Sequence, residues 1–153
     1  MGVWETPFLL DSLDKKQQTM RQIKFRGIRK RLDKEEHEWV YGDMFHTTEN
    51  GDVCIQWWED GFYKRFEVWK DTVGQFTGLK DKNGQEIYEG DILKCKYVDE
   101  YYTYKVKYTS RDNHWAHFTL IDSEGYFEKI SDPDEMEVIG NIHDNPELLE
   151  TTD

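Results

Sequence analysis

The sequence predicts a mainly β fold, a small β-barrel with additional β-hairpins and little helix, and three observations lead to this prediction. Apolar and polar side chains alternate along short segments, as they do on a strand with one buried face. Asn-Gly and Asp-Gly pairs separate several of these segments, and both residues of such a pair tolerate the positive φ of a two-residue hairpin turn. No segment shows a competing helical or coiled-coil period.

The expected strands follow one another along the chain with short connections. They occupy residues 23–26, 37–47, 52–59, 62–69, 75–80, 85–91, 92–97, 98–110, 114–121, 125–130 and 135–142. The expected turns lie at Asn50-Gly51, Asp60-Gly61, Asn83-Gly84 and Asp122 to Glu124. Residues 144–150 are expected to form a turn or a single helical turn, because Asn145 precedes Pro146.

The composition predicts one domain with a core built from large rings. The chain has 153 residues, which is enough for one domain with a real hydrophobic core. Although 34% of the residues are charged, 6 Trp, 9 Tyr and 8 Phe supply a large apolar area in few positions. We therefore expect a core that is aromatic rather than aliphatic. Residues 1–19 are expected to be an N-terminal extension, residues 20–150 the β domain, and residues 151–153 the end of an acidic tail.

The net charge argues against a general affinity for nucleic acids. The chain has 32 acidic and 20 basic side chains and a formal net charge of -12, whereas proteins that bind nucleic-acid backbones need a positive face. The charge is uneven, because 8 of the acidic residues follow Lys129 and no Lys or Arg does. Residues 1–129 are therefore close to balanced, and the C-terminal segment is the acidic part.

The two cysteines and the absence of long apolar segments predict a cytoplasmic protein that does not contact a membrane. Cys54 and Cys95 each lie in an apolar run and have no spacing typical of a metal site, so we expect reduced, buried thiols. No window of the sequence has the apolar length of a transmembrane helix, and the first residues lack the basic region of a secretory signal.

The stretch from Gly74 to Tyr97 contains the clearest turn residues. Asn83-Gly84 is expected to form a hairpin turn with Gly84 at positive φ. Gly90-Asp91 then leads into aliphatic residues, as is common where a strand of a small SH3-like barrel begins. Glycine permits the sharp bend, and the Asp91 carboxylate can accept hydrogen bonds from nearby backbone amides. We therefore predict a structural role for these four residues.

Three ordered blocks of the sequence closely resemble the YopX family of phage and prophage proteins. The blocks are IKFRGIRKRLDKEEHEWVYGDMF, TVGQFTGLKDKNGQEIYEGDILKC and MEVIGNIHDNPELLE. The resemblance extends from Met20 to about Glu150 and leaves the first 19 residues outside. It implies a small, mainly β protein of phage or prophage origin with an SH3-like barrel and no assigned activity, so it supplies no catalytic residues.

Catalytic and metal-binding patterns are weak. His114 and His117 would lie on opposite faces of a strand, which does not favour a shared metal ion. The acidic pairs Asp132 with Asp134 and Glu135 with Glu137 could bind a cation or act as acid and base, as in a cation-dependent hydrolase. A solvated acidic loop is the simpler interpretation of these pairs. No catalytic site, metal site or cofactor is therefore predicted.

A basic cluster gives the best local case for binding phosphate groups. It consists of Arg26, Arg29, Lys30 and Arg31. Basic side chains position a nucleic-acid backbone, and aromatic side chains nearby can stack on bases. The alternative is a hairpin held by ion pairs, because the acidic stretch DKEEHE follows directly.

Two adjacent tryptophans, Trp57 and Trp58, predict an exposed binding residue. Successive side chains of a strand point to opposite faces, so we expect one of the two to be buried and the other to lie at the surface. An exposed tryptophan is typical of a protein-binding anchor.

The interpretation that the sequence favours is a non-enzymatic accessory protein of a phage or prophage that acts in the bacterial cytoplasm. It is expected to bind a macromolecule, in the first place a host or phage protein, with a second copy of the chain as an alternative partner. Two other functions stay open. One is nucleic-acid binding through Arg26 to Arg31, and the other is a cation-dependent hydrolase that uses the acidic segment.

Overall fold

A computed structural model describes residues 22–31, 37–47, 51–111, 115–125, 127–130 and 133–150. The expected extension at residues 1–19 and the tail end at residues 151–153 lie outside the described residues, as do Asn50, His114 and Asp132.

The described residues form strands and short 3-10 helices. The strands are β1 (Phe25–Ile28), β2 (Trp39–His46), β3 (Val53–Glu59), β4 (Phe62–Val68), β5 (Gly74–Lys80), β6 (Glu86–Tyr88), β7 (Asp91–Tyr97), β8 (Glu100–Arg111), β9 (Trp115–Ile121), β10 (Phe127–Lys129) and β11 (Met136–Asn141). The 3-10 helices are η1 (Lys70–Thr72), η2 (Pro133–Glu135) and η3 (Pro146–Leu149). A mainly β protein is therefore confirmed, and η3 is the single helical turn expected after the last strand.

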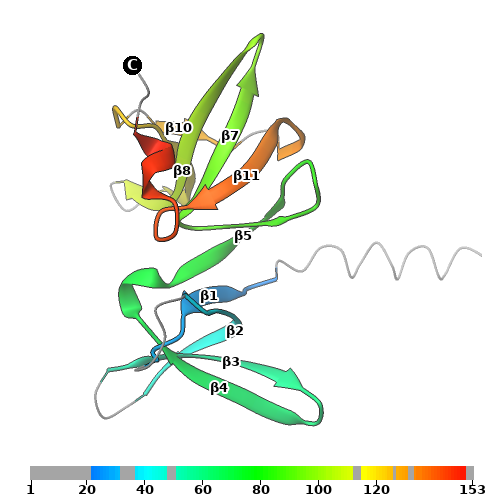
Figure 1. Cartoon of the computed structure of the whole chain (residues 1–153), viewed down its shortest axis with the longest axis vertical. Coiled ribbons are helices and arrows are strands. Elements are labelled where there is room, and N and C mark those ends of the chain that lie inside the picture. The colour runs from blue at the N-terminus through cyan, green and yellow to red at the C-terminus, as the bar shows by residue number, and fades with distance from the viewer. Residues whose placement is uncertain are drawn as a thin grey trace, which may run out of the picture.

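The strands form two antiparallel sheets that give the molecule two lobes (Figure 1). One sheet has six strands in the order β4-β3-β2-β1-β5-β6, and the other has five in the order β10-β9-β8-β7-β11. The first sheet curls, because Arg29 forms a β-bridge with Val68 and Trp69 N–H donates to the Ile28 carbonyl over 2.9 Å. The strands nevertheless lie in two sheets and not in one closed barrel, so the SH3-like barrel is not confirmed.

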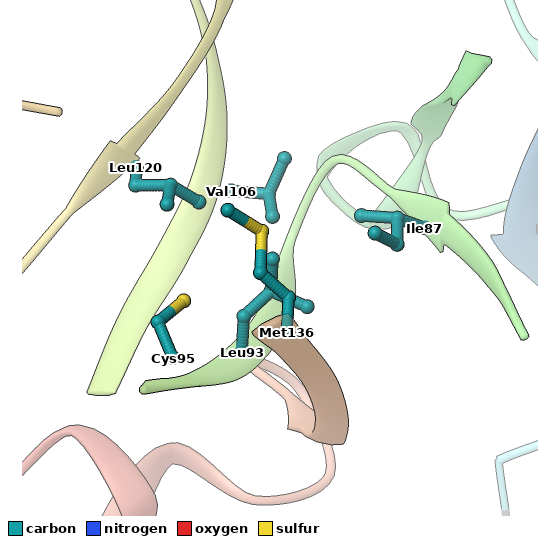
Figure 2. Packing of buried hydrophobic residues seen from close by; sticks show 6 residues of the cluster. All are labelled: Ile87, Leu93, Cys95, Val106, Leu120 and Met136. Atoms are coloured by element: carbon teal, nitrogen blue, oxygen red, sulfur yellow. The ribbon is translucent and has the colours of Figure 1, made fainter. Parts of the chain in front are cut away.

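Each sheet has its own apolar cluster. In the first sheet the cluster consists of Val40, Val53, Ile55 and Val68, with Trp57 and Phe66 packed against it. In the second it consists of Ile87, Leu93, Cys95, Val106, Leu120 and Met136 (Figure 2). Ile87 comes from β6, so a strand of the first sheet contributes to the second cluster.

The prediction of an aromatic core is wrong for the described residues. Among the side chains whose burial the structure describes, the buried hydrophobic ones are mostly aliphatic, and Phe76 and Tyr88 are the only buried aromatic ones. Branched aliphatic side chains fit the inner faces of these small sheets. Trp57 and Phe66 pack at the border of the first cluster, and rings such as Trp58, Phe62 and Tyr63 are exposed.

The observed turns explain where the strands end. Asp60 and Gly61 have φ of 53° and 87° and connect the paired residues Glu59 and Phe62, as expected for a two-residue hairpin. The turn between β7 and β8 is also a two-residue turn, and it differs from the prediction, which placed Val98 in a strand. Tyr97 pairs with Glu100, and Val98 therefore lies in the β7–β8 turn with a φ of 57°.

Candidate functional site

Arg26, the first residue of the predicted basic cluster, is buried between the two sheets. Its Nη1 lies 2.6 Å from Asp91 Oδ1, and the side chains are 8% and 1% exposed. Its guanidinium also lies over the rings of Trp39 and Tyr88, at 4.6 and 5.1 Å from the ring centroids. Arg26 therefore joins β1 to the start of β7 and is not available to a phosphate group.

The other basic residues of the cluster contact carboxylates. Arg29 and Arg31 both form ion pairs with Glu38. The hydrogen bond from Arg31 helps to hold the pKa of Glu38 below its ordinary value. Lys30 Nζ lies 3.0 Å from Asp52 and 3.8 Å from Glu67, and the hydrogen bond to Asp52 raises its pKa. The structure thus brings the cluster together as a set of ion pairs.

Gly90 and Asp91 form the corner that leads into β7. Gly90 has a φ of 85°, and its N–H donates to the Val106 carbonyl over 2.9 Å. Tyr88 N–H donates to Asp91 Oδ2 over 2.7 Å. Burial raises the pKa of Asp91, while the charge of Arg26 acts in the opposite direction. One short segment therefore bends the chain and also supplies the carboxylate that binds Arg26.

Asp81, which the sequence interpretation missed, organises the turn at Asn83-Gly84. Asp81 Oδ1 accepts hydrogen bonds from the N–H groups of Asn83 and Gln85 at 2.8 and 2.9 Å, and Oδ2 accepts one from Val138 at 2.9 Å. Burial raises the pKa of Asp81, but these hydrogen bonds outweigh it, and the pKa lies below its ordinary value. The turn, with Gly84 at a φ of 82°, is thereby tied to the edge strand β11. An aspartate two residues before the asparagine of Asn-Gly is the signal that could have indicated this.

A polar cavity of about 300 Å³ lies between the sheets. It is lined by Arg26, Trp39, Tyr41, Gln85, Asp91, Val138, Ile139, Gly140, Asn141 and Asp144. Asp144 accepts hydrogen bonds from Trp39 Nε1 and Asn141 Nδ2, both at 2.8 Å, and it contacts His37 Nδ1. Burial raises the pKa of Asp144, and these hydrogen bonds lower it to below its ordinary value. Most polar side chains of this cavity form hydrogen bonds or ion pairs with one another, and these contacts connect the two sheets.

Trp57 and Trp58 point to opposite faces of β3. Trp57 packs with Phe66 against the apolar cluster of the first sheet, with ring centroids 5.6 Å apart. Trp58 is 62% exposed and contacts the ring of Tyr63 edge to face at 4.8 Å. Phe62 and Tyr63, both 66% exposed, lie beside the same hairpin turn. We call Trp58, Phe62 and Tyr63 the hairpin patch.

A second feature, which we call the aromatic shelf, involves the face of the β3–β4 hairpin opposite to Trp58 and Tyr63. It is an open cavity of about 630 Å³ between the first half of β2 and the β3–β4 hairpin. Its lining consists of Lys24, Glu38, Trp39, Val40, Tyr41, Trp57, Lys64 and Phe66. The ionisable groups of the shelf are already paired, Lys24 with Glu86, Lys64 with Glu59, and Glu38 with arginines. The shelf therefore offers mainly uncharged rings to a ligand.

The described residues include acidic side chains, histidines and cysteines, which can hold a metal ion only where several of them converge. Within them, no group of three or more His, Cys, Asp or Glu side chains is arranged to hold a metal ion. Glu137, a member of the predicted acidic pairs, forms an ion pair with Lys82. Both cysteines are buried free thiols, and burial raises the pKa of Cys54. Among the described helices, none is long and apolar enough to span a membrane.

Comparisons with known proteins identify the family. The model of the YopX family, described as YopX protein, matches residues 24–150. No curated protein matches the chain. Among solved structures, the crystal structure of protein EF1440 from Enterococcus faecalis is similar, with 26% sequence identity and a TM-score of 0.48. That match covers 86% of this chain and 100% of the other. Because the family model covers most of the sequence, the chain belongs to the YopX family.

Proposed function

We propose that the chain is a non-enzymatic accessory protein of a phage or prophage, which binds a host or phage protein in the bacterial cytoplasm through the hairpin patch. The observation that carries this proposal is the exposure of three large rings at one hairpin end, 62% for Trp58 and 66% each for Phe62 and Tyr63. Tryptophan and tyrosine are the side chains that most often dominate the energy of protein interfaces. Trp58 and Tyr63 are in ring contact and form one exposed apolar group, with Phe62 beside them at the hairpin end, and such exposure is typical of an interaction site.

The surroundings of the hairpin patch favour a protein partner over a nucleic acid. Lys64 on the same hairpin is held by Glu59, and the residues Arg26 to Arg31 are engaged by carboxylates. A nucleic acid would have to displace these carboxylates from the basic side chains, on a protein whose net charge is -12. The hydrolase alternative has no supporting arrangement of acidic groups among the described residues.

Site-specific photo-crosslinking in lysogenic or infected bacteria tests the proposal. A photoreactive phenylalanine replaces Trp58 in one protein and Tyr108 in the other. Tyr108 is a suitable control because it is an exposed aromatic residue, 44% exposed, on the other sheet. We expect a discrete protein adduct from position 58 that is absent from position 108. Equal adducts from both positions, or none from position 58, would contradict the proposal, and an adduct of twice the chain mass would identify self-association.

A further inference from the structure

Strand β2 changes its pairing partner part of the way along its length. Residues Trp39 to Gly42 pair with β1, whereas Asp43 to His46 pair with β3. The change occurs at Gly42, where an added Cβ would lie only 2.1 Å from the carbonyl oxygen of Gln56. Beyond this close contact, β2 and β3 form no further pairs, and the aromatic shelf lies between them.

The hydrogen-bond pattern defines which backbone groups face this gap. Arg29 N–H donates to the Glu38 carbonyl, so that pair is hydrogen-bonded, and hydrogen-bonded pairs recur at every second residue of an antiparallel ladder. Val40 and Gly42 therefore direct their N–H and C=O groups towards β1. Trp39 and Tyr41 direct theirs the other way, towards the gap, where no pair with β3 is formed. Among the described residues, two N–H donors and two C=O acceptors thus form an open strand edge beside the shelf.

We propose that an extended segment of a partner protein binds here by adding a strand to the open edge of β2, with its apolar side chains on the aromatic shelf. Strand addition to an exposed sheet edge is a common mode of peptide recognition, in which backbone hydrogen bonds supply affinity and side-chain pockets supply specificity. The proposal names the partner's binding segment and so rests on the proposed function.

The chemistry of the shelf defines the segment. Trp39 and Trp57 donate their indole N–H groups to Asp144 and Glu59, so their rings present carbon atoms. Because the ionisable groups of the shelf already have partners of opposite charge, a charged side chain would gain no ion pair there without breaking an existing one. Side chains at alternate positions of the partner segment are therefore uncharged and apolar. Trp57 lines the shelf and its neighbour Trp58 belongs to the hairpin patch, but the two side chains point to opposite faces of β3. A partner that contacts both features therefore has to extend around the β3–β4 hairpin.

Amide hydrogen exchange on the full chain, followed by NMR, tests the open edge directly. In the free protein we expect the amides of Trp39 and Tyr41 to exchange rapidly and that of Val40 to be protected. Protection of Trp39 and Tyr41 at every protein concentration and with residues 1–19 removed would overturn the proposal. Protection that disappears on removing residues 1–19, or that grows with protein concentration, would also overturn it, in favour of the chain's own N-terminal segment or a second copy.

Peptide binding tests strand addition and its direction. The probe is an end-capped, fluorescein-labelled hexapeptide of alternating threonine and leucine, and binding is measured by fluorescence anisotropy. Two further probes carry N-methyl groups on either the odd or the even residues, which removes the N–H donors from one edge only. We expect one methylated set to weaken binding roughly tenfold or more and the other to have little effect. Equal binding by all three probes, or no binding at millimolar concentration, would contradict strand addition.

A pair of variants separates the backbone from the ring. Tyr41→Pro removes an N–H that faces the gap and leaves the β1 ladder intact, because proline is tolerated on such an edge. Tyr41→Ser removes the ring and keeps the N–H. We expect the proline variant to lose more peptide affinity than the serine variant, and Tyr108→Ser to lose none. Should the hexapeptide bind as expected while position 58 gives no crosslink, the proposed function fails and the open edge stands.

Discussion

Replacing Asp91 with alanine is expected to lower the free energy of unfolding by about 3 to 5 kcal/mol, the usual effect of removing one partner of a buried ion pair. Arg26 Nη1 lies 2.6 Å from Asp91 Oδ1, and both side chains are nearly inaccessible to water. The variant leaves a buried guanidinium whose Nε already has no hydrogen-bond partner in the described part of the chain. It also removes the acceptor of Tyr88 N–H. These losses share the same carboxylate, so they are not additive.

Urea unfolding followed by tryptophan fluorescence measures this effect, and two further variants define its cause. Asp91→Asn keeps an oxygen that can accept from Tyr88 N–H, so it should lose less stability than alanine. Glu137→Gln removes the charge of a half-exposed ion pair with Lys82 and is expected to lose less than about 1 kcal/mol. If Asp91→Ala lost no more than Glu137→Gln, the buried pair would not hold the two sheets together, and our argument about Arg26 would be wrong.

Three other predictions concern the turns and the tryptophans. Gly84→Val is expected to lower the stability by about 1 to 2 kcal/mol in a thermal melt, because the φ of 82° strains a β-branched residue. No atom lies within 4 Å of the added Cβ, so the expected loss comes from the backbone conformation. Gly84→Asn should lose less stability, and an unchanged melting temperature for the valine variant would refute the turn assignment. Asp81→Ala should destabilise by about 1 to 3 kcal/mol at pH 7. Its lowered pKa means that this stabilisation is present above the unfolded pKa of about 3.9 and is lost as the pH falls through the folded value, so urea unfolding near pH 2 should show a smaller difference. Trp57→Ala should cost about 3 kcal/mol, and Trp58→Ala should mainly reduce partner binding; equal destabilisation by both would show that both are core residues.

The strands and turns could be predicted because their signals are local. The Asp60-Gly61 and Asn83-Gly84 pairs are short, and each connects strands that are neighbours in sequence. Even so, Val98 was misplaced, because its β-branched side chain favours a strand while the register of β7 and β8 requires it in the turn. The pairing of β7 with β8 along the whole hairpin therefore outweighs the preference of Val98 for a strand.

The contacts between the sheets could not be predicted from local patterns. Arg26 and Asp91 are distant in sequence, as are Asp81 and Val138. A basic cluster followed by acidic residues indicated ion pairs in general, and it did not show that Arg26 turns away from the cluster into the interior. The open edge at Trp39 and Tyr41 could not be predicted from the sequence either. Both halves of β2 have the same strand pattern, and they differ only in their pairing partner, which changes at Gly42.

The same contacts that join the sheets also account for the open edge. Trp39 donates to Asp144 near the end of β11 and lies under the guanidinium of Arg26, so the first half of β2 is held at the junction with the second sheet. The β3–β4 hairpin packs with Val40 of β2 around Val53, Ile55 and Val68, and the end of the hairpin continues away from that junction (Figure 1). Because the backbone of Trp39 to Gly42 pairs with β1 and that of Asp43 to His46 pairs with β3, β2 separates from β3 on the N-terminal side of Asp43. An edge that no described strand pairs with, beside an aromatic surface, is a liability that proteins usually cover, and this is the reason to look for a partner strand there.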